Sequence, residues 1–470
     1  MHIRKARLIG AAAAFVALST VVAACGSDSD SADTGSGGDS KPVEAIHVPG
    51  DFKTIQEAVD NASEGDLILV DEGVYEEAVD VTTPDITIRG VDRNKVILDG
   101  KFELENGIRV LDTDGVVVEN MTARNYVSNG FYWTGSDRYR GSYLTAYRNG
   151  DYGIYAFDAY HGQLDHSLGS GSPDAGFYIG ECYRCDAVID SVVSEYNGLG
   201  YSGTNSGGDL YIVNSTFRNN RAGIVPNAGS YELCYPGRDN TIVGNVVYDN
   251  NYLDGPGIDV SLMAQGNGIL LAGSINNVIE RNLVYDHDRT GIAAVPFPEE
   301  DASDTPPTAD ELDIPCDETK DDELPDEADI PGTVIWNATG NRVVGNVIEN
   351  SGLADIASAT IALNPDDPST AELDNCFSDN TIETSAPTDL EALAPCDGDG
   401  NGGSFDDGAL DLLVLINEQP DAPAKDSYKS TPEPEDQESM PDPLTTPWKK
   451  FEAPTKPDVD AIKVPAKPKD

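Results

Sequence analysis

Basic residues are scarce in this chain. It has 30 lysines and arginines against 83 aspartates and glutamates, which gives a formal net charge of -53 at pH 7. Nucleic-acid binding needs an excess of basic residues that displaces phosphate counterions, so we expect no nucleic-acid partner. The acidic excess is typical either of a solubility or high-salt adaptation or of calcium binding. The chain has five histidines and four methionines, which are too scattered to predict a copper site.

Long hydrophobic runs are also missing. Leu8–Ala24 is the longest apolar run, and it follows the basic start MHIRKAR. It is too short for a committed membrane span and has the pattern of an export signal. It ends in the residues VAAC at 22–25, which resemble a bacterial lipobox. A secretory signal with a chance cysteine is the alternative interpretation.

The lipobox interpretation divides the N-terminus in two. Residues 1–24 are a lipoprotein signal peptide, and residues 25–42 are a flexible tether rich in Gly, Ser and Asp. Cys25 is the residue that carries lipid, and two or three acyl chains on one cysteine anchor a protein stably. We therefore expect an exported protein whose membrane contact is a lipid anchor on the outer face of the bacterial cell membrane.

Cysteine is rare, with seven residues in the chain. Removing the lipid-bearing Cys25 leaves six, an even number that predicts disulfides in an exported protein, with fifteen possible pairings. The close pair Cys182 and Cys185 could instead hold zinc or act as a redox dithiol. No second CxxC motif follows and no βα unit surrounds the pair, so we favour a disulfide.

Glycine recurs at a nearly constant interval. Gly107, Gly130, Gly153 and Gly176 are each 23 residues apart, Gly200 follows after 24 and Gly223 after 23, and Gly268 and Gly291 are again 23 apart. A bulky residue follows each glycine: Ile108, Phe131, Ile154, Phe177, Tyr201, Ile224, Ile269 and Ile292. The repeat predicts short strands whose bulky residues stack in the interior, and strand alternation turns the next residue outward.

A second strand family ends in an Asn-x-x-x-x-Asn/His pattern. Its examples begin at Asn120, Asn214, Asn245 and Asn282. Asparagine tolerates left-handed turns, and stacked asparagines can bond from rung to rung. A 23-residue unit is too short for a βαβ crossover or a propeller blade, and the leucine-rich frame is absent. It matches one turn of a β-solenoid.

These repeats resemble the pectate-lyase-like superfamily of right-handed parallel β-helices, which includes sugar hydrolases, lyases and carbohydrate binders. The segment TIQEAVDNASEGDLILVDEGVYEEAV from Thr54 is similar to the N-terminal start of that fold, with a capping helix, a first strand and a GxY turn, particularly as in pectin methylesterases. The resemblance covers roughly residues 43–385. It implies an all-β, right-handed parallel β-helix of about ten to twelve coils with an N-terminal capping helix, and it is weak for activity.

The remaining segments differ in composition. Residues 299–332 form an acidic insertion that we expect as a solvated loop, after which coils resume at Val334. Residues 386–418 are a C-terminal cap, with apolar residues at helical spacing from Ala409. Residues 419–470 are rich in proline and charge and are expected to be a disordered or loosely docked tail.

The window from Met121 to Cys185 holds fourteen of the chain's 34 aromatic residues. The outward position after the repeat glycine is occupied in turn by Arg109, Tyr132, Tyr155 and Tyr178. Rungs lie ~4.8 Å apart, so the tyrosines would form an external ladder. Such a ladder either stacks on sugar faces or stabilises an exposed sheet.

The following turn carries the candidate chemistry. Asp158 and Glu181 are expected one rung apart, with Arg138, His161 and Arg184 stacked alongside. Neighbouring carboxylates raise one another's pKa, and a separation near ~5 Å suits a retaining glycosidase. Alternatively the carboxylates bind calcium while arginine abstracts a proton, as in pectate lyases, or the groups form a charge network on a turn. We predict Asp158, His161, Glu181 and Arg184 as catalytic and Arg109, Arg138 and the three tyrosines as substrate-binding.

The superfamily's catalytic signatures are absent, both the Asn-Thr-Asp, Gly-His-Gly and Arg-Ile-Lys motifs of polygalacturonases and the Gln/Asp motifs of pectin methylesterases. Asp397, Asp399 and Asn401 form a weak calcium candidate, because Gly408 stands where an EF-hand needs its glutamate.

Two hypotheses follow. The protein is a membrane-anchored lipoprotein that binds and cleaves polysaccharide as a lyase or hydrolase, or it is a non-catalytic glycan-binding or structural solenoid.

Overall fold

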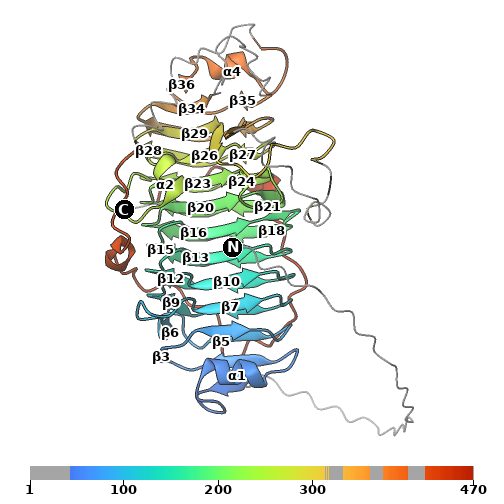
Figure 1. Ribbon diagram of the computed structural model, residues 1–470, viewed down its shortest axis with the longest axis vertical. Coiled ribbons are helices and arrows are strands. Elements are labelled where there is room, and N and C mark those ends of the chain that lie inside the picture. The colour runs from blue at the N-terminus through green and yellow to red at the C-terminus, as the bar shows by residue number, and fades with distance from the viewer. Residues whose placement is uncertain are drawn as a thin grey trace, which may run out of the picture. The chain divides into compact units, whose positions relative to one another are not determined.

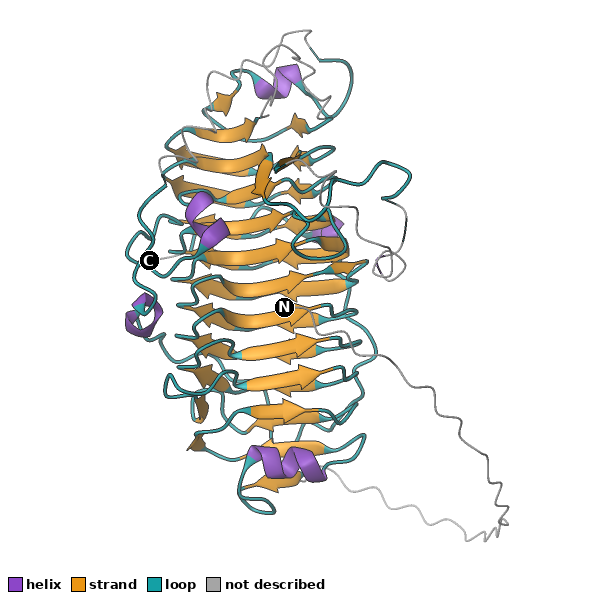
Figure 2. Ribbon diagram, in the orientation of Figure 1, coloured by secondary structure: helices purple, strands orange, loops and turns teal. Residues whose placement is uncertain are grey.

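The computed structural model describes residues 43–312, 314, 316, 332–359, 374–400 and 419–468. Parallel strands stack into three long sheets, which we name A, B and C, and successive coils contribute to each sheet in turn (Figures 1 and 2). The chain is therefore a parallel β-helix, as the repeat predicted.

Sheet A contains β1 (Ile46–Val48), β2 (Leu67–Val70), β5 (Thr87–Gly90), β8 (Val117–Glu119), β11 (Arg140–Ser142), β14 (Gln163–Asp165), β17 (Cys182–Tyr183), β18 (Ala187–Asp190), β21 (Ser206–Val213), β24 (Arg238–Val243), β27 (Val278–Glu280), β32 (Arg342–Val344) and β35 (Cys376–Ser378). Sheet B contains β3 (Gly73–Tyr75), β6 (Val96–Asp99), β9 (Thr122–Arg124), β12 (Thr145–Tyr147), β15 (Leu168–Ser170), β19 (Val193–Glu195), β22 (Thr216–Arg218), β25 (Val246–Tyr248), β28 (Leu283–His287) and β33 (Val347–Ser351). Sheet C contains β4 (Val79–Val81), β7 (Ile108–Leu111), β10 (Phe131–Thr134), β13 (Tyr152–Phe157), β16 (Ala175–Gly180), β20 (Leu199–Thr204), β23 (Ala222–Asn227), β26 (Ile269–Ala272), β29 (Thr290–Val295), β34 (Ala354–Ser358) and β36 (Ser385–Ala386).

The glycine repeat sets the register of sheet C. Phe131 pairs with Ile108 on one side and with Ile154 on the other, and all three are at most 1% exposed. The glycines let adjacent coils approach, because a Cβ at Gly130 would lie 2.7 Å from the carbonyl oxygen of Gly153. The predicted interior stack is confirmed, and its apolar side chains line the core along the solenoid.

The asparagine pattern serves two purposes. Asn245, Asn282 and Asn346 stack inside, and the side-chain amide of each donates to the next oxygen along the column at 2.9–3.0 Å. Asn120 and Asn214, by contrast, adopt left-handed backbone angles at turns, with φ of 61° and 50°. Both predicted roles therefore occur, at different members of the repeat.

A histidine ends one of these ladders. Asn250 follows Asn220 in the column, and its amide lies 3.2 Å from Nε2 of His287. His287 is 2% exposed and its Nδ1 has no hydrogen-bond partner among the described residues. Burial lowers the pKa of His287 to about 3, so the imidazole stays neutral inside the fold.

This neutral histidine predicts acid lability. The unfolded chain takes up a proton below about pH 6.5, whereas the folded chain does so only near pH 3, so stability is lost as the pH falls through this window. We expect His287→Asn to recover roughly 2–3 kcal/mol of stability at about pH 4.5 relative to pH 7, since each pKa unit is worth about 1.4 kcal/mol. Denaturant unfolding at the two pH values measures this. His47→Asn, in the first coil, is the control, and equal acid lability in His287→Asn and wild type would contradict the assignment.

The N-terminal cap follows the sequence closely. Helix α1 (Ile55–Asn61) begins after Thr54, whose side chain accepts a hydrogen bond from the Glu57 amide at 3.1 Å. Ile55, Ala58 and Val59 bury the apolar face of the helix over the first coil. The GVY motif is the strand β3 rather than the expected turn, because it pairs in parallel with β6.

The acidic insertion changes where the coils resume. β30 (Phe297–Glu300) and β31 (Thr333–Trp336) pair antiparallel, so Val334 belongs to a hairpin and the parallel coil resumes only at β32. The expected start at Val334 is therefore wrong. Residues 317–331 lie outside the described residues.

The helices besides α1 are short. They are α2 (Asp259–Met263), α4 (Leu390–Leu393) and the 3₁₀ helices η3 (Ser427–Ser430) and η4 (Val459–Ala461). α4 packs on β34 and β35, where the C-terminal cap was expected, but the apolar segment from Ala409 lies outside the described residues. No described helix has the length and apolar character that crossing a membrane requires.

The six cysteines after Cys25 form three disulfides: Cys182–Cys185, Cys234–Cys316 and Cys376–Cys396. The disulfide interpretation of the CxxC pair is therefore confirmed. The second bond joins two insertions, because Cys234 lies between β23 and β24 and Cys316 lies in the acidic insertion.

Residues 419–468 are not the disordered or loosely docked tail that their composition predicted. They follow a defined path along the solenoid, drawn in red in Figure 1, and we name residues 427–467 the C-terminal strap. The strap first runs toward the first coil, where the Leu444 carbonyl accepts a hydrogen bond from Val43. It then returns along the coils, and Lys467 pairs with Glu349 at 2.7 Å.

Buried arginines explain why this proline-rich segment is ordered. Its carbonyls have no partners of their own in a sheet, and the solenoid supplies donors for them. Arg89 donates to the carbonyls of Pro443 and Thr446, and Arg93 donates to that of Glu438. These guanidiniums are contributed by coils far away in sequence, so composition alone could not reveal them.

Candidate functional site

The three tyrosines of the outward row form a continuous aromatic ladder on sheet C. Tyr132 pairs in register with Tyr155, and Tyr155 with Tyr178. Their ring centroids are 4.9 and 4.7 Å apart, and Tyr152 stacks on Tyr155 at 4.3 Å from the same strand. The predicted ladder exists, and Tyr152 widens it. We name these four residues the tyrosine ladder.

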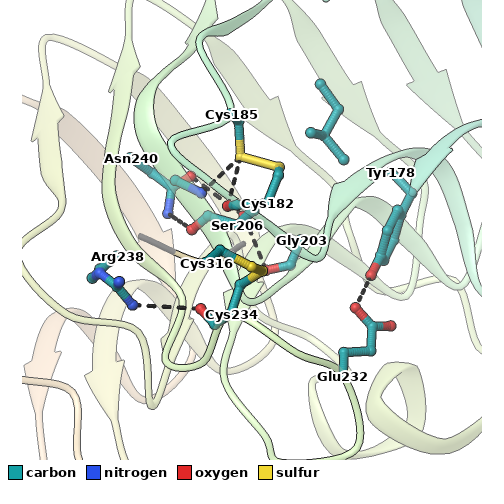
Figure 3. The surroundings of a disulfide bond; sticks show 12 residues. Tyr178, Cys182, Cys185, Gly203, Ser206, Glu232, Cys234, Arg238, Asn240 and Cys316 are labelled. Carbon is teal, nitrogen blue, oxygen red and sulfur yellow. Dashed lines mark hydrogen bonds between the residues drawn. A yellow bond between two sulfur atoms is a disulfide. The ribbon is translucent and has the colours of Figure 1, made fainter. Parts of the chain in front are cut away.

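The end of the ladder is covered. Residues 228–236, which connect β23 to β24, form a cover loop, and Tyr178 beneath it is 1% exposed. The Tyr178 hydroxyl donates to Oε2 of Glu232 at 2.5 Å, as Figure 3 shows. Tyr132 and Tyr155 are partly exposed. The surface open to a ligand therefore contains two of the three predicted tyrosines, and Tyr178 supports the loop.

Glu232 is the residue with the most unusual acidity on this face. Burial, with smaller contributions from the negative charges of Glu181 and Asp174, raises its pKa to about 8, although the Tyr178 hydrogen bond opposes the shift. A carboxyl group with this pKa is mostly protonated at neutral pH. Glu232 can therefore donate a proton where an ordinary glutamate could only accept one.

The second carboxylate comes from the repeat itself. Glu181 follows β16, is 9% exposed, and its Oε2 accepts a hydrogen bond from the Leu233 amide at 3.2 Å. Asp158 precedes it by one rung, since Phe157 pairs with Gly180 and the Asp158 amide donates to the Gly180 carbonyl. The predicted rung relation of Asp158 and Glu181 is correct.

Sequence reasoning missed Glu232 because the cover loop lies outside the repeat. One signal existed, since the interval from Gly223 to Gly268 is nearly two repeats long and marks an insertion at this point. The position of Glu232 inside that insertion, and its contact with Tyr178, depend on how the loop folds back over sheet C.

Two disulfides hold the backbone next to these acids. Glu181 precedes Cys182, which is bonded to Cys185, and Glu232 lies two residues before Cys234, which is bonded to Cys316 (Figure 3). The guanidinium of Arg238 also donates to the Cys234 carbonyl at 3.4 Å. Both acids are therefore attached to covalently closed segments, which favours a fixed geometry.

Two more carboxylates lie beside the ladder. Asp174 accepts a hydrogen bond from the Tyr152 hydroxyl at 2.7 Å. Burial raises the pKa of Asp151 to about 6. Both residues stand two positions before a repeat glycine, Gly153 or Gly176, so the 23-residue period was a signal that could have found them.

Arg184 does not stack with His161 as predicted. Arg140 pairs with Gln163, 23 residues later, but Gln163 pairs with Val188, 25 residues later. The two additional residues fall in the segment closed by the Cys182–Cys185 disulfide. Because of them, Asp186 lies beside His161 where Arg184 was predicted, and Arg184 is exposed.

His161 and Arg138 belong to a charged corner rather than to the ladder. His161 Nδ1 lies 2.5 Å from Oδ1 of Asp137, and its Nε2 lies 3.8 Å from Oδ2 of Asp186. Arg138 pairs with Asp85 at 3.1 Å, and Lys450 of the C-terminal strap reaches the same carboxylate at 2.7 Å.

The site expected as one patch therefore has two parts. Asp158, Glu181 and the tyrosines lie on or next to sheet C, while the corner groups lie where the C-terminal strap packs. Arg109 keeps its predicted place in the outward row below Tyr132, with its guanidinium bonded to both oxygens of Asp80 at 2.9 and 3.1 Å.

The calcium candidate gains no support from its surroundings. Asp397 and Asp399 are described, whereas Asn401 and Gly408 lie outside the described residues. Within the described ranges, no group of three or more His, Cys, Asp or Glu residues is placed to hold a metal ion.

Residues 129–296 match the family of the right-handed β-helix region. This match covers the tyrosine ladder and the cover loop, and it adds the handedness to the strand pairing described above. No curated protein matches the chain in sequence.

Several solved structures are similar to this chain at low sequence identity. The A-module of the mannuronan C-5 epimerase AlgE4 from Azotobacter vinelandii is 14% identical, with 78% of this chain and 97% of that chain covered and a TM-score of 0.47. The pectate lyase Pel9A is 12% identical, with 86% and 90% covered and a TM-score of 0.42. The alginate lyase from Paenibacillus sp. str. FPU-7 is 13% identical, with 70% and 95% covered and a TM-score of 0.38. Similarities at this level carry no argument about activity.

Proposed function

We propose that this right-handed β-helix binds polysaccharide along the tyrosine ladder and cleaves it with the acid pair Glu232 and Glu181. The observation that carries the proposal is the pKa of Glu232, raised to about 8 next to a second carboxylate at the end of an aromatic row. Carboxyl groups in unequal protonation states beside a sugar-stacking surface are the parts that glycosidic cleavage needs.

Binding is assigned to the exposed part of the ladder. Tyr132 and Tyr155 present partly exposed rings in adjacent strands, so a glycan could lie across the strands with a sugar face on each ring. Aromatic rings supply a large apolar surface together with a polar hydroxyl, which suits sugars that have one apolar face.

The acid pair has complementary roles. Protonated Glu232 donates to the glycosidic oxygen, and ionised Glu181 acts as the base or the nucleophile. Asp174 helps to keep this division, because its negative charge favours the proton on Glu232. His161, Arg138 and Arg184 have no part in this proposal, since they lie at or beyond the corner.

A second candidate is a binding protein without turnover. Tyr178 and Glu181 are almost completely covered, whereas Tyr132 and Tyr155 are not. This distribution favours a protein whose exposed tyrosines bind glycan and whose cover loop, with its acidic residues, only stabilises the fold.

Tyr155→Ala tests the binding surface that both candidates share. Removing the central ring of the ladder is expected to weaken glycan binding by roughly 1–3 kcal/mol, the value of one stacking contact. Calorimetry or affinity electrophoresis with a polysaccharide found by screening the soluble residues 41–470 measures the change.

Tyr248→Ala is the matched control, because Tyr248 also contacts a tyrosine of the next coil, Tyr285 at 4.9 Å, but on sheet B. Equal losses in the two variants would show a general effect on the solenoid. Undiminished binding by Tyr155→Ala would remove the ladder from the site.

We also propose that the protein is exported and anchored by lipid at Cys25. The six later cysteines are all disulfide-bonded, which supports folding in an oxidising compartment. The lipobox residues themselves are outside the described part of the chain, so the anchor depends on the sequence.

Cys25→Ser is the test of the anchor. We expect wild type to fractionate with membranes and to label with a radioactive or clickable fatty acid, and the variant to lose the label and either to leave the membrane or to stay unprocessed. Cys182→Ser serves as a control for losing a cysteine. A soluble, unlabelled wild type would exclude lipidation.

A further inference from the structure

We infer that the ligand of the tyrosine ladder is an uncharged polysaccharide and that its cleavage is hydrolysis rather than β-elimination. The inference depends on the proposed function and names its substrate class. It comes from the signs of the charges around the ladder and from what each reaction requires of them.

Carboxylates dominate the surroundings of the ladder. Glu181 and Asp112 act on the hydroxyl of Tyr132. Asp151 and Asp174 raise the pKa of the Tyr155 hydroxyl, and the Asp174 carboxylate accepts a hydrogen bond from the Tyr152 hydroxyl at 2.7 Å. A polyuronate carries one negative charge on every sugar. Like charges repel, and they repel more strongly near a protein surface than in bulk water because the effective dielectric constant is lower there.

The cations of this region are already engaged. Arg109 lies next to Tyr132 and lowers the pKa of its hydroxyl, but Nε and Nη2 of this guanidinium both donate to Asp80. Arg138 is held by Asp85 in the corner. Arg184 is exposed, but it follows β17, which pairs in sheet A and not in sheet C. Among the described residues of this face, the arginines that could bind a uronate carboxylate are therefore already paired with an aspartate.

Elimination chemistry needs such a cation. A lyase removes the C5 proton of a uronate, and the negative charge that develops on the adjacent carboxylate must be stabilised by positive charge. A sugar with a hydroxymethyl group at C5 has no comparably acidic proton and cannot follow this route.

Hydrolysis matches the groups that are present. The proton of Glu232 goes to the glycosidic oxygen as its bond to C1 breaks, and the oxygen of a water forms the new bond to C1. One proton of the water stays on the new C1 hydroxyl and the other passes to Glu181. Exchange with solvent then removes the proton from Glu181 and returns one to Glu232. The sugar hydroxyls find acceptors in Asp151 and Asp174, which a neutral ligand can approach without charge repulsion.

Matched polymers test the charge requirement. Polygalacturonate and alginate would each be compared with their carboxyl-reduced forms, which keep the linkages but replace each carboxylate with a hydroxymethyl group. Uncharged xylan, mannan, galactan and β-glucan complete the panel for the full chain. We expect every polymer that binds to be uncharged, and each reduced form to bind at least tenfold more tightly than its polyuronate parent. The products should have reducing ends but no conjugated double bond.

A gain of binding gives an independent test. Asp151→Asn with Asp174→Asn removes two negative charges beside the ladder, and we expect polyuronate affinity to rise about tenfold at low salt. Glu349→Gln removes one acidic charge in a distant coil and should not change polyuronate affinity.

The outcomes separate the inference from the proposed function. If polyuronates bind more tightly than their reduced forms and Tyr155→Ala abolishes that binding, the ladder is a glycan site and the substrate class is wrong. Release of unsaturated products would overturn the hydrolytic assignment in the same way. If no polymer depends on Tyr155, the proposed function fails, and the inference fails with it.

Discussion

Glu232→Gln is expected to lower the rate of glycan cleavage about 10²–10⁴-fold while leaving glycan binding within about twofold of wild type. Glutamine keeps an oxygen that can accept the Tyr178 hydrogen bond, so the cover loop should stay in place. It has no proton to give to a glycosidic oxygen. The proposed binding surface consists of Tyr132 and Tyr155, which the substitution does not change.

The pH dependence identifies this acid specifically. With a pKa near 8, activity that needs protonated Glu232 should fall as the pH rises through about 8. Because the pKa of the folded state lies above the ordinary value of 4.5, the unfolded chain holds fewer protons between these values, and stability also decreases as the pH rises across this window.

Tyr178→Phe serves as the companion variant. The Tyr178 hydrogen bond lowers the pKa of Glu232, so losing the hydroxyl should move the alkaline limb of the activity profile to higher pH. A merely structural role for Tyr178 would leave that limb unmoved. Full turnover in Glu232→Gln would show that Glu232 only anchors the cover loop.

Arg93→Met is expected to destabilise the protein by about 3 kcal/mol or more and to release part of the C-terminal strap. Arg93 is 3% exposed and donates to the carbonyls of Leu144, His166 and Glu438. Burial lowers its pKa to about 10, so the guanidinium is still charged at neutral pH. Methionine fills similar space but removes the donor from the carbonyls of His166 and Glu438, whereas the Leu144 carbonyl keeps its hydrogen bond from the Leu168 amide. Each unpaired buried group costs about 1–3 kcal/mol.

The measurement combines denaturant unfolding with limited proteolysis of the strap. Lys467→Met is the control at the other end of the strap, where an exposed pair with Glu349 contributes about 0–1 kcal/mol. Equal effects of the two variants, or an intact and protease-resistant strap in Arg93→Met, would contradict the assigned role of Arg93.

The sequence by itself determined the coil and the direction of its side chains. A bulky residue such as Phe131 after every repeat glycine can be buried only if the coils stack in register, so period and burial specify one solenoid. The same logic placed Tyr132, Tyr155 and Tyr178 in one outward row, and Asp158 one rung from Glu181. These relations lie within the repeat, where strand alternation and rung spacing leave no other arrangement.

Only the tertiary structure decided what covers that row. The contact of Glu232 with Tyr178 spans 54 residues, and that of Arg93 with Glu438 spans 345. The 23-residue period predicts neither contact, because an insertion or a terminal segment folds back to wherever buried donors and acceptors can pair with its polar groups. Arg184 shows the converse, since two additional residues shifted its register and placed Asp186 beside His161 instead. A repeat fixes neighbours one coil apart, whereas the acidity of Glu232 comes from burial by a loop outside the repeat.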